Sequence, residues 1–91
     1  MEWLAVQPYY KIRREVGSTE QRTIEENRTL YLYNDKIVTQ YREFPITDVF
    51  DVSYRKMGET GGFLYLHTKL GVYSYTVKDN PASFIKAFKS L

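Results

Sequence analysis

A chain of 91 residues is long enough for one compact domain and too short for two domains with separate cores. Its apolar residues (43%) and aromatic residues (16%) are sufficient for a packed core, which excludes a disordered chain. Thirteen Lys and Arg against eleven Asp and Glu give a formal charge of +2, too small to mark a nucleic-acid-binding or membrane-binding surface by itself.

The chain contains no cysteine, so disulfides, thiolate metal sites and a cysteine nucleophile are excluded. Glu2 stands where a secretory signal peptide carries basic residues, and the apolar run before Gln7 is too short for such a signal. No apolar run approaches the roughly 20 residues that a membrane-spanning helix needs. We therefore expect a cytoplasmic protein.

The first third of the chain has the alternating pattern of β-strands. Side chains of residues 3–15 alternate between two faces, which predicts one or two strands bent at Pro8. Residues 17–19 are typical of a turn. Residues 20–33 continue as a strand, and the polar interval 25–28 within them indicates either a bulge or an exposed sheet edge.

A tight hairpin follows. The alternating runs TLYLY and KIVTQY flank Asn34-Asp35, and both turn residues tolerate positive φ. Pro45 ends the second run, because proline has no amide hydrogen to donate to a ladder.

The segment PITDVFDVSYRK (residues 45–56) predicts the next strand. Phe50, Val52 and Tyr54 fall on one face of it and polar side chains on the other. We expect Phe50 and Val52 to be buried in the core of a curved sheet.

A second hairpin and a helix complete the chain. FLYLHTK and VYSYTV are alternating runs joined by Leu70-Gly71, and the glycine-rich residues 58–62 connect them to the preceding strand. Asp79 or Asn80 is suited to cap a helix that Pro81 opens. The helix carries one apolar stripe, with two lysines facing away from it: Phe84, Ile85, Phe88 and Leu91, against Lys86 and Lys89.

These elements predict a mainly β fold with one C-terminal α-helix. Six to seven antiparallel strands would form a curved sheet or half-open barrel, which avoids long open edges, and the helix would cap it. Burial of the three large side chains of the stripe would contribute roughly 1.5–3 kcal/mol each. One domain would span residues 1–91.

The order TLYLYNDKIV, FPITDVFDVSYRK, GGFLYLHTKLGVYSYTV and NPASFIKAFKSL resembles the bacterial PH-like domains, relatives of the pleckstrin-homology and GRAM superfold. The matching segments are residues 30–38, 45–52, 62–77 and 80–91. Because these motifs are hydrophobic patterns, the resemblance implies a fold and no particular ligand.

The densest basic stretch is formed by Lys11, Arg13 and Arg14. In phosphoinositide-binding PH domains, basic residues at the end of the first strand hold phosphates, and the resemblance implies that role for these three. Glu15 and Glu20 offset their charge, and Arg14 projects on the face opposite Lys11 and Arg13. Peripheral binding of anionic membrane lipid is therefore an alternative function, and solvated strand charges are the simpler interpretation.

Four strand tyrosines form a second candidate surface: Tyr31, Tyr33, Tyr73 and Tyr75. An exposed surface of this kind would bind an extended peptide or another copy of the chain. Stacking of nucleic-acid bases is not expected, because such surfaces carry a stronger basic balance. Ordinary cross-strand pairing also explains tyrosines in strands.

The chain shows no catalytic pattern. His67, the only histidine, is predicted to be half-buried on a strand, and no Ser-His-Asp or metal-ligand spacing surrounds it. Gly61-Gly62 lacks the lysine and hydroxyl residue of a phosphate-binding loop. We expect no enzymatic activity, no metal, no cofactor and no small-molecule substrate.

The sequence thus predicts a non-enzymatic binding or assembly module. Its leading mechanism is association with a protein partner, or self-association as a homo-oligomer, by strand addition to an open sheet edge or through the tyrosine-rich face. Nucleic acid is not an expected partner.

Overall fold

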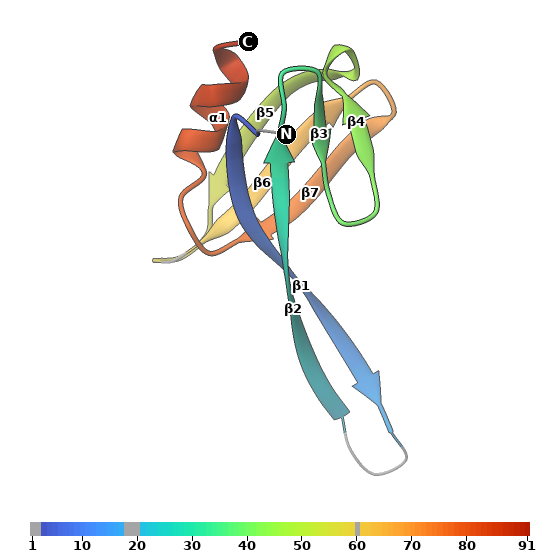
Figure 1. Cartoon of the computed structure of the whole chain (residues 1–91). Coiled ribbons are helices and arrows are strands. Elements are labelled where there is room, and N and C mark those ends of the chain that lie inside the picture. The colour runs from blue at the N-terminus through green and yellow to red at the C-terminus, as the bar shows by residue number, and fades with distance from the viewer. Residues whose placement is uncertain (1–2, 18–20, 60) are drawn as a thin grey trace.

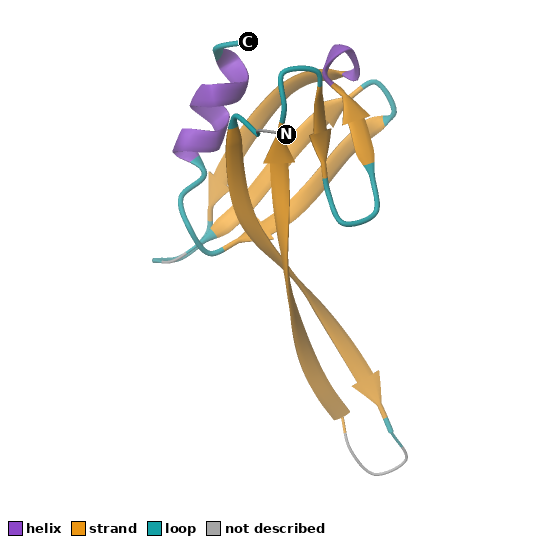
Figure 2. Cartoon of the chain, in the orientation of Figure 1, coloured by secondary structure: helices purple, strands orange, loops and turns teal. Residues whose placement is uncertain are grey.

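The computed structural model describes residues 3–17, 21–59 and 61–91, which form seven antiparallel strands in one unclosed sheet and a single C-terminal helix (Figures 1 and 2). This confirms the predicted mainly β architecture. The sheet order is β4-β3-β2-β1-β7-β6-β5. The elements are β1 (Ala5–Val16), β2 (Gln21–Leu32), β3 (Lys36–Val38), β4 (Glu43–Pro45), η1 (Ile46–Asp48), β5 (Val49–Lys56), β6 (Gly62–Thr68), β7 (Gly71–Val77) and α1 (Ala82–Lys89).

The sheet is curved because its two end strands, β4 and β5, are consecutive in the chain. Only the three residues of the 3-10 turn η1 join them, and three residues span at most about 10 Å. In a flat sheet the two ends would lie roughly 29 Å apart. The backbone N–H of Ile46 donates to the Asp35 carbonyl at 2.9 Å, and that of Lys69 donates to the Asp48 carbonyl at 3.0 Å, so η1 is fixed to both ends of the sheet. The result is the expected half-open barrel.

The concave side of the sheet holds the core, which α1 closes (Figure 1). The helix begins at Ala82 with Pro81 at its N-cap position, one residue later than predicted, and Asn80 Oδ1 accepts a hydrogen bond from the Ala82 N–H at 2.9 Å just before it. Leu91 is 54% exposed, so the predicted apolar stripe reaches the core only as far as Phe88. The fully buried side chains come from strands on both halves of the sheet, from the helix and from the residue before it: Leu30, Leu32, Ile37, Val52, Leu64, Leu66, Val77, Phe84 and Pro81.

The predicted strand 45–56 is wrong at its beginning. Residues 46–48 form η1, and β5 starts only at Val49. The register between β5 and β6 then shifts between Val49 and Asp51, so that Phe50 is the extra residue of a β-bulge. Val52 is buried as expected, but Phe50 is 68% exposed, because the bulge breaks the alternation on which its predicted burial depended.

The β1–β2 hairpin extends well beyond the barrel (Figure 1). Its pairing is regular from Ala5–Leu32 to Val16–Gln21, with no break at Pro8 and no bulge in the interval 25–28. β3 pairs only with the last two residues of β2, and β7 pairs with β1 at Tyr10. The far half of the hairpin is therefore a two-stranded ribbon with a free edge on each side, and the molecule measures 50 × 28 × 27 Å. Residues 18 and 19 of the predicted turn lie outside the described residues.

Phe84→Ala tests the closing role of the helix. We expect a loss of about 3–5 kcal/mol in the free energy of unfolding, because the substitution leaves a cavity in the core. Urea denaturation followed by tyrosine and tryptophan fluorescence measures it. Lys86→Ala, at an exposed site of the same helix, is the control and should change stability by less than about 0.5 kcal/mol. Equal losses in the two variants would contradict the closing role.

Candidate functional site

The strand β5 presents the longest open edge at either end of the sheet. It is last in the strand order, so one side of its eight residues has no partner strand in the described chain. The opposite end, β4, is only three residues long and finishes at Pro45, which has no N–H to donate. Because an unpaired row of backbone N–H and C=O groups is a template for another strand, the β5 edge is the better docking site.

A partly apolar groove lies beside the beginning of β5. Its volume is about 620 Å³, and the last turn of α1 forms one wall. Phe50 and Leu91 are exposed at its rim, while Val49 is buried at its base. Lys89 Nζ lies 4.0 Å from Asp51 Oδ1, a contact between two exposed side chains. The lining residues are Asn34, Ile46, Val49, Phe50, Asp51, Phe88, Lys89 and Leu91.

On the outer face, β5 and β6 bring Ser53 and His67 together. The Oγ of Ser53 lies 2.7 Å from Nε2 of His67, which is half-buried as predicted. Directly opposite residues of the two strands share a face, and Asp51 is opposite His67. The sequence carried no signal for this pair, because only the strand register brings residues 53 and 67 together.

The two glycines where β6 begins, Gly61 and Gly62, have a structural role. Gly61 has φ of +81°, which favours glycine, and its carbonyl accepts hydrogen bonds from Met57 N and from the Tyr54 hydroxyl. A Cβ at Gly62 would lie 2.2 Å from the Arg55 carbonyl oxygen, so no larger residue fits without a shift of the backbone. The pair therefore permits the tight connection of β5 to β6.

The four candidate tyrosines do not form one exposed surface. Tyr73 and Tyr75 are directly opposite the buried Leu66 and Leu64, so both point inward, and Tyr75 is only 6% exposed. Tyr31 pairs with Val38 on the outer face. The predicted surface is wrong because alternation shows which side chains of a strand share a face, but it does not show which face of each strand points to the core.

A polar cavity of about 170 Å³ lies between β1, the β3–β4 connection and β7. The Arg42 guanidinium stacks over the Tyr73 ring, 5.0 Å from its centroid. Tyr9 and Tyr75 meet edge to face with ring centroids 4.9 Å apart. Burial raises the pKa of Tyr75 to about 12, and the neighbouring Tyr9 contributes. The described lining contains two cations and no carboxylate: Tyr9, Lys11, Thr39, Tyr41, Arg42, Tyr73, Ser74 and Tyr75.

The structure separates the three predicted basic residues. Lys11 lines the polar cavity, whereas Arg13 Nη2 lies 3.3 Å from Glu26 Oε1 farther along the ribbon. Arg14 is on the opposite face, as its parity predicted. The cation that joins Lys11 is instead Arg42, an isolated arginine in a connection that no sequence pattern marked.

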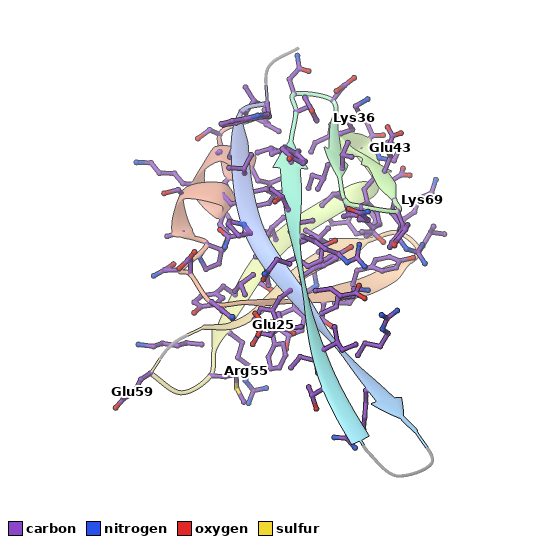
Figure 3. All side chains as sticks on the ribbon, turned by 60° about the horizontal axis from the view of Figure 1, so that its bottom comes forward. Glu25, Lys36, Glu43, Arg55, Glu59 and Lys69 are labelled. Carbon is purple, nitrogen blue, oxygen red and sulfur yellow. The ribbon has the colours of Figure 1, made fainter. Side chains whose placement is uncertain are left out.

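Other charged side chains pair away from these sites (Figure 3). Lys36 Nζ and Glu43 Oε1 are 3.3 Å apart across β3 and β4, and Lys69 approaches Asp48 at 3.7 Å. On the ribbon, Glu25 bonds to Lys78 and raises the pKa of that lysine. Arg55 lies at the far end of β5, near the connection that carries Glu59 (Figure 3).

The described residues include no group of three or more His, Cys, Asp or Glu arranged to hold a metal ion. None of the helices in the described ranges has the length and apolar character to cross a membrane. Comparisons with protein families, with curated proteins and with solved structures give no match.

Stability at high pH tests the burial of Tyr75. The folded residue keeps its proton up to about pH 12, whereas an unfolded tyrosine loses it near pH 10. The folded state therefore binds more protons between these values, and its stability falls as the pH rises through this window. Tyr75→Phe should reduce that fall, as measured by urea denaturation between about pH 9 and 11.5. Tyr41→Phe removes an exposed hydroxyl as the control, and an unchanged slope in Tyr75→Phe would contradict the assignment.

Proposed function

We propose that this chain is a non-enzymatic binding module that docks proteins by strand addition to β5. The observation that carries the proposal is an unpaired eight-residue edge beside a groove lined by apolar and polar side chains. An added strand gains affinity from main-chain hydrogen bonds, and pockets along the edge select its side chains. The β5 edge supplies the main-chain hydrogen bonds, and the groove supplies a pocket for a side chain of the added strand.

The bulge at Phe50 supports this function. Bulges in edge strands redirect side chains, and here an aromatic ring stands 68% exposed at the rim of the groove. Burial of a phenylalanine side chain contributes roughly 1.5–3 kcal/mol, so a bound strand that covers the ring gains a substantial part of its affinity there. Leu91 offers a second exposed apolar contact on the α1 side of the groove.

We further propose that the chain is a PH-like domain of the cytoplasm. The succession of seven antiparallel strands followed by one closing helix supports the first part. The absence of cysteine from the whole sequence agrees with the second.

Phe50→Asp tests the docking site. A library of extended peptides is selected on the immobilised protein, and affinities of the selected peptides are measured by fluorescence polarisation. We expect Phe50→Asp to weaken binding at least about tenfold, because it places a charge where an apolar contact forms.

Leu70→Asp, at a site 78% exposed in the β6–β7 turn and outside the groove, is the matched control and should bind like the wild type. Amide resonances of residues 49–56 should shift on peptide binding. Peptides that bind equally to both variants and leave β5 unperturbed would overturn the proposal.

The polar cavity favours a second candidate function, binding of anionic membrane lipid. Lys11 and Arg42 lie on its wall without a carboxylate in the described lining, so a lipid phosphate would meet two cations there. Arg13 and Arg14 point elsewhere on the ribbon, so only Lys11 of the three predicted residues takes part.

Vesicle sedimentation tests this second candidate. The wild type should sediment with phosphatidylcholine vesicles that contain phosphatidylserine, less so as salt rises, and not with phosphatidylcholine alone. Lys11→Glu with Arg42→Glu should abolish binding, while Arg14→Glu, on the opposite face, should retain most of it. Equal loss in both would show that general charge, not the cavity, attracts the vesicle.

A further inference from the structure

We propose that the partner at the β5 edge is a second copy of this chain, paired β5 to β5 about a two-fold axis that passes beside Ser53. The inference rests on the proposed function and names its partner. It follows from the order of side chains along the edge.

An antiparallel pair of identical strands centred on Ser53 is self-complementary. Asp51 of one copy lies directly opposite Arg55 of the other, and the symmetry repeats this pair. Both side chains are exposed and project from the outer face, opposite His67 and Phe63 of β6. On the inner face, the register places Tyr54 of one copy beside Val52 of the other, which is already buried in its own core. The complementarity of the pair therefore comes from the opposite charges on the outer face.

Neighbouring registers lack this complementarity. In a continuous sheet, opposite residues must share a face, so the axis can move only by whole residues. An axis at Val52 places Asp51 opposite Ser53 and runs Phe50 of the bulge against Tyr54. An axis at Tyr54 places Arg55 opposite Ser53 and Val52 opposite Lys56. The charges thus specify the Ser53 register.

The same register brings apolar surface to the groove. The residue that follows β5 in the second copy is Met57, which is 48% exposed. Because the bulge at Phe50 adds one residue, Lys56 of the second copy comes opposite Val49, and Met57 follows it at the groove of the first copy; symmetry repeats the contact. The exposed approach of Lys89 to Asp51, at 4.0 Å, is too loose to prevent Asp51 from pairing with an arginine.

This association ends at two copies. A two-fold pair covers both β5 edges at once, so the same contact cannot recruit a third copy, and each molecule keeps the three-residue β4 edge and the free edges of its β1–β2 ribbon. The assembly is therefore a closed dimer with a sheet continuous across both chains.

Charge reversal tests the register. Sedimentation equilibrium is run on the wild type, on Asp51→Arg, on Arg55→Asp, on the double variant and on an equal mixture of the two single variants, with circular dichroism of each to verify folding. Each single variant places like charges opposite one another twice and should raise the dimer dissociation constant about tenfold or more. The double variant restores opposite charges and should dimerise like the wild type.

The mixture is the most demanding measurement. When an Asp51→Arg chain pairs with an Arg55→Asp chain, opposite charges face one another at both ends of the strand pair, so a heterodimer should form from two chains that do not dimerise alone. A wild type that stays monomeric at every concentration overturns the proposal, as does a dimer that both single variants leave unchanged, or a mixture that stays monomeric. If the protein is a monomer whose β5 edge still binds peptides in the Phe50→Asp experiment, only this inference fails and the proposed function stands.

Discussion

The three-residue connection between β4 and β5 is the constraint on which the rest of the structure depends. It joins the two ends of a seven-stranded order, so the sheet must bend until those ends meet. A bent sheet encloses its concave face but leaves an opening, and the opening requires an apolar element to exclude water. The stripe on α1 supplies that element, with Phe84 completely buried.

The same constraint explains why a docking edge remains. The end strands approach each other at η1 but do not pair, so the barrel stays open there. On one side the edge is short and finishes with proline, a feature that discourages strand addition. On the other side β5 offers eight residues with a partly apolar groove next to them. A protein of this size could shield that edge with a longer loop or with a proline, and this chain does neither.

Local pattern in the sequence was sufficient for most of the fold. The Asn34-Asp35 turn is where the sequence predicted it, while the turn between β6 and β7 at residues 69–70 and the start of the helix at Ala82 each lie one residue from the predicted position. Such features depend on residues within a few positions of one another, so one sequence contains the information.

The candidate site depended on information of another kind. The bulge at Phe50 depends on the register between β5 and β6. The inward orientation of Tyr73 and Tyr75 depends on the register between β6 and β7. Ser53 meets His67, and Arg42 joins Lys11, only once the strands are assembled. Alternation gives two faces for each strand but does not say which is inside, nor where an extra residue interrupts the count.

The bulge also has a consequence for how this chain tolerates changes of length. Because Val49 is opposite Thr68 and Asp51 is opposite His67, removal of Phe50 would leave the two flanking pairs adjacent and the ladder uninterrupted. Deletion of one residue anywhere from Asp51 to Arg55 would instead move the side chains on one side of the deletion to the opposite face of the sheet. Phe50 is thus the residue of β5 whose deletion would disturb the strand pairing least. At this position the edge can gain or lose an exposed aromatic side chain while the rest of the barrel keeps its register.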